Sequence, residues 1–243
     1  MHLHIQQNPE AVSLELAEWI TASVESVLQK QDKCTLVLTG GSSPKRLYDL
    51  LATAPYKERI DWSRLHIFWG DERAVPFTDD RNNAKMTCEH LLSKVPVLKK
   101  NIHIMRTDIE PEQSATEYEK ILHSYFAETG KSFDIVLSGM GDDGHTLSLF
   151  PGTEVIHEKK LWVKAFYLVP QQMFRITLTA PIVNRAAKIA FLAFGAGKAH
   201  ALKEVLEGKY NPDLYPSQII QPEAGELHWF TDIAAAAALE KEK

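Results

Sequence analysis

The chain has 243 residues, and its 27 lysines and arginines against 32 aspartates and glutamates give a formal net charge of −5. Hydrophobic residues make up 44% of the chain, which is enough for a substantial core. This balance excludes nonspecific binding to nucleic acid, which needs a basic surface, and no apolar run approaches the roughly 18–20 residues of a membrane span. An anionic small molecule stays compatible with the charge, because it needs only a local positive site.

The cysteines and the N-terminal residues indicate the cellular compartment. Cys34 and Cys88 are the only cysteines, too few for a disulfide scaffold, so we expect reduced thiols. Residues 1–9 lack the basic start and apolar stretch of a signal peptide. The sequence therefore predicts a cytoplasmic protein.

In the first half of the chain, short apolar runs alternate with helical patterns. Leu16, Ile20 and Val24 recur at helical spacing, and Pro44 fits the first turn of a helix. The predicted elements are, in order, a helix over 11–29, a strand over 35–39, a helix over 44–51, a strand over 65–69, a helix over 82–92, a short strand over 102–105 and an amphipathic helix over 112–126.

The second half continues this alternation. The predicted elements are a strong strand over 133–138, strand-like runs over 161–166 and 175–179, a buried strand over 188–194, a helix over 198–206, a last strand over 227–230 and a small terminal helix over the alanines 234–238. Near-continuous apolar strands separated by helices predict a mainly parallel sheet with helices on both faces. We expect residues 1–243 to form one α/β domain.

In such a sheet the ligand site lies beyond the carboxyl ends of the strands. The residues that follow Leu38, Trp69, Leu137 and Phe194 should therefore converge on one crevice. The first of these segments is Gly40-Gly41-Ser42-Ser43, which combines two flexible glycines, two hydroxyls and the start of a helix. This combination suits a phosphate, and the alternative is a tight strand-to-helix turn.

The second segment places Asp71, Glu72 and Arg73 directly behind a buried strand, where charges are costly without partners. Arg73 could hold an anionic group, and Asp71 could position a hydroxyl or act as a base. The alternative is an internal ion pair of Glu72 with Arg73 or Arg81.

The third segment, residues 139–152, contains glycines at 139, 141 and 144 in the G-x-G-x-x-G spacing of dinucleotide-binding proteins. We reject that interpretation, because Asp142 and Asp143 would stand where a pyrophosphate must bind and no long helix follows. The glycines instead shape a loop that presents Asp143 and His145. A carboxylate beside an imidazole fixes its tautomer and stabilises its protonated form.

The fourth segment, Gly195-Ala196-Gly197-Lys198-Ala199, is similar to a phosphate-binding loop but lacks its first glycine and its Ser/Thr. Lys198 at a helix start can still bind a phosphate monoester, and the alternative is a surface lysine. Metal-ligand spacing and a G-x-S-x-G nucleophile motif are missing from the sequence, so we expect no metal and no cofactor. This inventory suits proton transfer on a phosphorylated small molecule.

Together these segments resemble the 6-phosphogluconolactonase family. The resemblance spans roughly residues 35–206, and its most specific part is G-D-D-G-H-T-L-S-L-F-P-G at 141–152. It implies a fold like that of glucosamine-6-phosphate deaminase, a modified doubly wound α/β sandwich. The chain departs from the family at Asn82, where serine is usual, and at residues 169–174, which replace a Lys-Pro-Pro segment before Arg175.

The resemblance implies hydrolysis of 6-phospho-D-glucono-1,5-lactone to 6-phosphogluconate, the second step of the oxidative pentose phosphate pathway. It places activation of water on His145 and substrate binding on Arg73 and Lys198, with Arg175 as a phosphate or orienting contact. Since a lactone is an activated ester, no nucleophilic serine is required, and Asp143 could orient the imidazole. The oxyanion needs donors, which the turn at 40–42 or the loop at 141–144 could supply.

Two alternatives remain. A glucosamine-6-phosphate deaminase would carry a glutamate shortly after its Gly-His, whereas residues 146–151 contain no acid. A non-catalytic sugar-phosphate sensor would need a DNA-binding segment, and no basic helix-turn-helix precedes Ala11. The expected partner is a small phosphosugar lactone, without nucleic acid or membrane, for a monomer or weak homo-oligomer.

Overall fold

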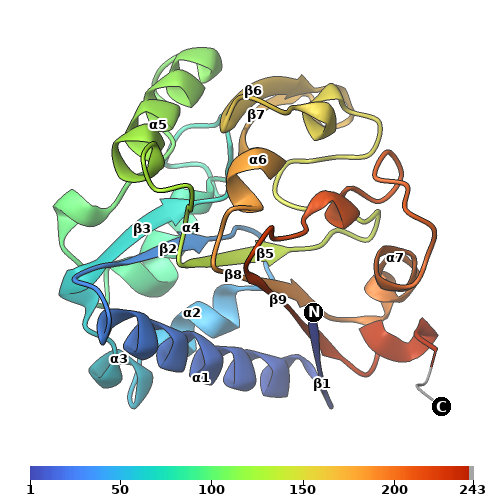
Figure 1. The fold of residues 1–243 in the computed structure, drawn as a ribbon, viewed down its shortest axis with the longest axis horizontal. Helices are drawn as coiled ribbons and strands as arrows, with labels where there is room; N and C mark the ends of the chain where they lie inside the picture. Colours follow the sequence, from blue (N-terminus) through green and yellow to red (C-terminus); the bar gives the residue numbers. More distant parts are fainter. Residues whose placement is uncertain (241–243) are drawn as a thin grey trace.

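The computed structural model of the protein describes residues 1–240, and a six-stranded parallel sheet forms its centre (Figure 1). The strand order is β1-β9-β8-β5-β2-β3, and every neighbouring pair is parallel. The strands are β1 (His2–Gln6), β2 (Cys34–Leu38), β3 (Leu65–Trp69), β5 (Ile135–Gly139), β8 (Lys188–Ala193) and β9 (Glu226–Asp232). All five residues of β2 are buried, as expected for a strand covered on both faces.

Helices cover both faces of this sheet, as the sequence predicts (Figure 1). One face packs against α1 (Pro9–Leu28), α2 (Lys45–Leu51), α3 (Tyr56–Arg59) and α4 (Asn83–Thr87). The other face packs against α5 (Pro111–Phe126), α6 (Ala180–Val183) and α7 (Ala199–Leu206). Alternation along β2 sends Leu36 and Leu38 into the first core and Val37 into the second.

A second, antiparallel sheet was not predicted. Its order is β4-β7-β6, with β4 (Asp71–Arg73), β6 (Val163–Leu168) and β7 (Met173–Leu178). Gly70 joins the two sheets, because its N–H donates to the carbonyl of Leu38 and its own carbonyl accepts from the N–H of Leu178. The register pairs Arg73 with Arg175, so this small sheet brings two sequence-predicted cations together.

Several predicted elements differ from the structure. The expected strand over 102–105 reduces to a single bridge between Ile67 and Ile102, and the helix over 82–92 changes from α4 to a π-helix, Cys88–Leu92. The strand β1 was missed although His2-Leu3-His4-Ile5 alternates in polarity. Short 3-10 helices lie at Trp62–Arg64, Lys99–Asn101, Glu154–His157, Val169–Gln171, Ala196–Lys198, Pro216–Ile219 and Ala235–Ala238, the last in place of the predicted terminal α-helix.

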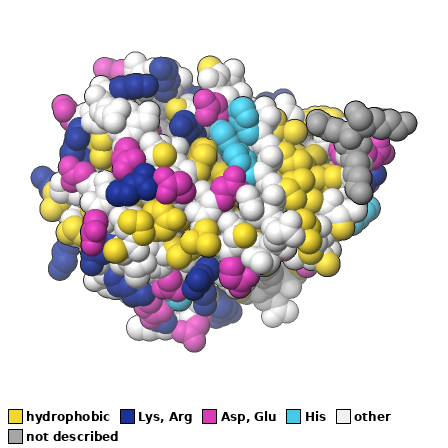
Figure 2. All heavy atoms as spheres, turned by 90° about the horizontal axis from the view of Figure 1, so that it is seen from below, with side chains coloured by type: hydrophobic (Ala, Val, Ile, Leu, Met, Phe, Trp, Pro, Cys, Tyr) yellow, Lys and Arg dark blue, Asp and Glu magenta, His cyan; other side chains and the backbone are white. Residues whose placement is uncertain are grey.

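The edge of the sheet at β1 exposes apolar side chains. Met1, Leu3 and Ile5 are all exposed, and Figure 2 shows hydrophobic side chains gathered beside histidines on this side of the molecule. Elsewhere on the face in Figure 2, lysines and arginines are interspersed with acidic side chains. Within residues 1–240, no helix combines the length and the apolar character needed to span a membrane.

Candidate active site

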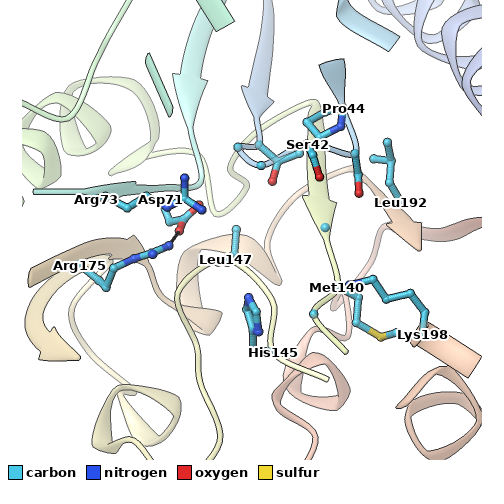
Figure 3. Close-up of a pocket in the computed structure, with 16 residues that line it drawn as sticks. Ser42, Pro44, Asp71, Arg73, Met140, His145, Leu147, Arg175, Leu192 and Lys198 are labelled. Atoms are coloured by element: carbon cyan, nitrogen blue, oxygen red, sulfur yellow. Dashed lines mark hydrogen bonds and ion pairs between the residues drawn. The ribbon is translucent and has the colours of Figure 1, made fainter. Parts of the chain in front are cut away.

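A cleft of about 200 Å³ opens at the carboxyl ends of β2, β3, β5 and β8. It is lined by segments that follow each of these strands, together with Leu147 and Arg175 (Figure 3). The four strand ends therefore converge on one cleft, as the sequence predicts. The cleft contains the sequence-predicted residues Gly40, Gly41, Ser42, Ser43, Asp71, Arg73, His145, Arg175 and Lys198.

The turn at 40–43 forms one wall of this cleft. Gly41 has φ +91°, a left-handed conformation that glycine adopts without strain. Among the residues that the structure describes, the N–H groups of Gly41, Ser42 and Ser43 make no hydrogen bond. Free backbone donors beside two serine hydroxyls provide a concave site for an anion.

Arg73 reaches the cleft from β4. Its Nη1 donates to Oδ1 of Asn83 at 2.8 Å and to the carbonyl of Arg81 at 2.9 Å. Neither acceptor carries a charge, and within residues 1–240 Arg73 forms no ion pair with a carboxylate, although its charge acts on nearby Asp71. This arrangement leaves a cation in the cleft for an anionic ligand.

Asp71 and Arg175 form a buried ion pair across the small sheet. Nη2 of Arg175 lies 2.6 Å from Oδ2 of Asp71, and the two side chains are 3% and 6% exposed. Ser148 bridges them, since its hydroxyl donates to Asp71 at 2.5 Å and accepts from Nε of Arg175 at 2.8 Å. Burial alone would raise the pKa of Asp71, but Arg175, Arg73 and the Ser148 hydroxyl hold it below the ordinary aspartate value.

His145 stands between the two ends of the cleft and is held on several sides (Figure 3). Its Nδ1 lies 2.6 Å from Oδ1 of Asp143, which also accepts the backbone N–H of His145 at 3.0 Å. The ring stacks on Phe150 with centroids 4.1 Å apart. A proton on Nδ1 satisfies Asp143 and leaves the Nε2 lone pair free to accept a proton.

Asp143 does not line the cleft, and its carboxylate contacts the His145 ring at Nδ1. Burial raises the pKa of this carboxyl, but the hydrogen bond and the charge of His145 outweigh burial and lower it overall. The carboxylate is therefore ionised at neutral pH and can stabilise a positive charge on the imidazole.

The loop that carries His145 is fixed by its own hydrogen bonds. Gly144 has φ +78°, and its carbonyl accepts both the N–H and the hydroxyl of Ser217. Further along, the Thr146 hydroxyl lies 2.6 Å from that of Ser138 on β5. The loop is therefore attached both to the sheet and to the segment at Pro216–Ile219.

Lys198 lies on the other side of His145 from Arg73 (Figure 3). Its Nζ pairs with Oδ1 of Asp142 at 2.6 Å. Since the Asp142 side chain is 71% exposed, this pair is solvent-screened and can open when a stronger anion arrives. The turn at 40–43 is thus flanked by a cation on each side.

The alternative interpretation, an internal ion pair of Glu72 with Arg73 or Arg81, is not found among the described residues. The Glu72 carboxylate accepts the backbone N–H groups of Arg73, Asn83 and Ala84 at 2.7–2.9 Å instead of an arginine side chain. Burial raises the pKa of Glu72 to about 7, against the three N–H donors, which lower it. Glu72 therefore organises backbone rather than balancing the Arg73 charge.

Three residues that sequence reasoning did not assign complete the site. Ser148 and Phe150 lie within the loop motif, but their contacts to Asp71 and His145 depend on the folded loop. Asn83 follows the family departure at Asn82, and only the fold brings it to Arg73. In the sequence, Ser148 and Asn83 were marked only by being polar residues close to the predicted site residues.

Replacing Gly141 with alanine should lower kcat by about 100-fold, an effect that small displacements of catalytic groups can produce. A Cβ atom there would lie 2.1 Å from Nδ1 of His145, so the ring must move. The measurement is steady-state turnover with the thermal midpoint as a folding check. Gly139→Ala is the comparison, because its Cβ would meet only Thr39 Oγ1 at 4.0 Å. If Gly141→Ala turned over as fast as Gly139→Ala, the position of the His145 ring would not matter for turnover.

Comparisons with known proteins agree with this geometry. The family described as glucosamine-6-phosphate isomerases/6-phosphogluconolactonase matches residues 7–229. The 6-phosphogluconolactonase of Synechocystis sp. is 38% identical over 224 residues, which cover 90% of each chain.

Solved structures show the same fold. The 6-phosphogluconolactonase from Trypanosoma brucei superposes with a TM-score of 0.85 at 26% identity, covering 98% of each chain. A monomeric glucosamine-6-phosphate deaminase superposes with a TM-score of 0.84 at 19% identity, covering 98% of this chain and 100% of that one, which shows a shared fold alone. The predicted deaminase-like α/β fold is therefore confirmed.

Proposed function

The chain belongs to the glucosamine-6-phosphate isomerase/6-phosphogluconolactonase family, and we propose that it hydrolyses 6-phospho-D-glucono-1,5-lactone to 6-phospho-D-gluconate by general-base catalysis. The observation that carries this mechanism is the His145–Asp143 pair, 2.6 Å apart, in a cleft flanked by two cations. The reaction is that of the oxidative pentose phosphate pathway.

His145 acts as the base. Its Nε2 takes a proton from a water molecule while the water oxygen bonds to the lactone carbonyl carbon. Asp143, ionised behind the ring, stabilises the imidazolium that results. When the tetrahedral intermediate collapses, the bond from the carbonyl carbon to the ring oxygen breaks, and the imidazolium returns a proton to that oxygen. The product is an open-chain acid with a new hydroxyl.

The phosphate binds at the turn. The free N–H groups of residues 41–43 and the Ser42 and Ser43 hydroxyls donate to its oxygens, with Arg73 on one side and Lys198 on the other. Substrate phosphate replaces Asp142 on Lys198, since a dianion is the stronger partner. Binding energy from this remote group positions the ring against His145.

Asp71 and Arg175 work as a unit. Asp71 lines the cleft as an ionised acceptor, suited to orient a sugar hydroxyl. Arg175 donates to Ser148, Gln171 and Asp71. Of the two roles that the sequence left open for Arg175, these contacts support the orienting one.

Arg73→Ala and Lys198→Ala should each raise KM about 10- to 100-fold, the equivalent of losing one charged hydrogen bond. The fall in kcat should be smaller, because neither side chain contacts the His145 imidazole. Initial rates over a range of lactone concentrations check this. Lys203→Ala is the control, since Lys203 on α7 pairs with Glu207 and Glu240 away from the cleft. An unchanged KM in both cleft variants would place the phosphate elsewhere.

The substrate assignment has a direct test against the deaminase reaction. Acid release from freshly generated 6-phosphogluconolactone should far exceed the spontaneous rate, and glucosamine 6-phosphate should release no ammonia. Residues 146–151 contain no acid to serve the deaminase chemistry. Ammonia release without lactone turnover would overturn the proposal, and binding of 6-phosphogluconate without turnover would indicate a sensor.

We also propose the compartment, the oligomeric state and the partners of this enzyme. Cys34 and Cys88 are both free, which fits a reducing compartment such as the cytoplasm. The two cores share one sheet, which supports the proposal of a single domain over 1–243. We further propose that this domain acts as a monomer or weak homo-oligomer. We expect no nucleic-acid partner at a net charge of −5, no membrane partner, and no cofactor.

A further inference from the structure

The side chain of Asn83 contacts three separate parts of the cleft wall. Its Oδ1 accepts Nη1 of Arg73 at 2.8 Å, and its Nδ2 donates to the carbonyl of Asp71 at 2.8 Å. It also fills the space beside Gly40. We propose that Asn83 is a positioning residue, which holds the Arg73 guanidinium against the turn at 40–43 and so sets the affinity of the phosphate site. This inference rests on the proposed function only in that the phosphate belongs to the substrate.

Among the described residues, the contact to Asn83 engages one guanidinium nitrogen of Arg73, and the other two make no hydrogen bond. Nη1 is shared between Asn83 and the carbonyl of Arg81, while within residues 1–240 no hydrogen bond engages Nη2. A guanidinium is planar, so fixing Nη1 restricts the direction in which Nη2 points. Without Asn83, the arginine would keep its charge but lose this orientation.

The contact to Gly40 ties the same side chain to the anion-binding turn. A Cβ atom at Gly40 would lie 1.8 Å from Oδ1 of Asn83 and 2.1 Å from its Cγ. Any side chain at residue 40 would clash with Asn83, which occupies that space. The distance between Arg73 and the turn is thus set by one amide group placed between them.

The backbone of Asn83 is itself held in place. The carboxylate of Glu72 accepts the N–H of Asn83 at 2.7 Å, the N–H of Ala84 at 2.9 Å and the N–H of Arg73 at 2.8 Å. One buried side chain therefore fixes both residues of the Arg73–Asn83 contact. These bonds make the start of α4 and the end of β4 a single unit.

The neighbouring asparagine provides a matched control. Asn82 is also buried, but its Oδ1 caps α4 by accepting the N–H of Lys85 at 2.8 Å and its Nδ2 donates to the carbonyl of Val75, so its side-chain hydrogen bonds do not involve Arg73. Asn82→Ala removes a helix cap and lowers stability without moving Arg73. Asn83→Ala removes the link to Arg73, so the two variants separate a loss of stability from a loss of orientation.

The test measures binding of inorganic phosphate by calorimetry, which needs no turnover. Asn83→Ala should weaken phosphate binding about 10- to 100-fold and raise KM for the lactone by a similar factor, with a much smaller change in kcat. Asn82→Ala should leave phosphate affinity unchanged. Gly40→Ala should behave like Asn83→Ala, because its Cβ displaces the same amide. Wild-type phosphate affinity in folded Asn83→Ala would overturn the proposal.

A double-mutant cycle separates positioning from a general disturbance. If Asn83 acts through Arg73, then Asn83→Ala should have little further effect on phosphate affinity in the Arg73→Ala background. Fully additive losses would contradict the proposal. Because the readout is phosphate affinity, a protein that binds phosphate as expected but does not hydrolyse the lactone would refute the proposed function and leave this inference standing.

Discussion

Replacing Arg175 with methionine should lower the free energy of unfolding by about 3–5 kcal/mol at neutral pH, the usual cost of removing one partner of a buried ion pair. Asp71 would then be an ionised carboxylate that is 6% exposed, with hydroxyl and amide groups as its hydrogen-bond donors and only the more distant charge of Arg73 to balance it. Ser148 would also lose the Nε donor that its oxygen accepts. Chemical denaturation at pH 7.5 measures this loss.

The same pair predicts the direction of a pH effect. In the wild type the folded-state pKa of Asp71 is lowered, so the pair's contribution is complete above the ordinary aspartate pKa, about 4, and is lost as the pH falls through the lower folded-state value. In Arg175→Met, burial without the arginine favours the protonated acid, so that variant gains stability as the pH falls. The difference between the two proteins should therefore be larger at pH 7.5 than at pH 5.

An exposed ion pair provides the comparison for this measurement. Arg106 pairs with Asp108 and Glu117 on the surface, where its side chain is 47% exposed. Arg106→Met should cost less than about 1 kcal/mol and show no comparable pH trend. Equal losses from Arg106→Met and Arg175→Met would contradict the expectation that breaking the buried Asp71–Arg175 pair costs more than breaking an exposed pair.

The central strands could be predicted because their sequences are unambiguous. Residues such as Leu36, Val37 and Leu38 are apolar without interruption, and a strand buried on both faces requires that pattern. Once those strands were assigned, the general rule that ligands bind at carboxyl ends located the cleft. The helix over 44–51 followed from Pro44 in the same local way.

The small sheet could not be predicted, because its causes are not local. Asp71-Glu72-Arg73 has the composition of a loop, and it becomes a strand only by pairing with residues about a hundred positions later. The contact between Asp71 and Arg175 depends on that pairing. A single sequence carries no record of such a distance.

Most residues that line the candidate site were predicted from the sequence, but most of the hydrogen bonds that connect them were not. Asp143 beside His145 is a contact between near neighbours, so the loop motif was enough to suggest it. Asn83 and Ser148 join residues from different strands, and their partners depend on side-chain directions. The partners of Glu72 were hidden for the same reason, because its carboxylate accepts backbone N–H groups that composition does not reveal.

His145→Ala should lower kcat by about 100- to 10,000-fold, the range for loss of a well-placed general base. The proposed phosphate contacts at residues 41–43, Arg73 and Lys198 do not involve the imidazole, so KM should change little. Because Asp143 is half exposed, water can solvate its carboxylate after the ring is removed, and the fold should remain intact. The residual rate should approach spontaneous hydrolysis of the lactone.

The central claim is tested most directly by kcat for freshly generated 6-phosphogluconolactone in the wild type, His145→Ala and His157→Ala. His157 also pairs with an aspartate, Asp213 at 2.9 Å, but lies outside the cleft, so it controls for the loss of a histidine–carboxylate pair as such. If His145 is the general base, His145→Ala loses nearly all turnover while His157→Ala keeps wild-type turnover. Wild-type turnover in folded His145→Ala would contradict this role.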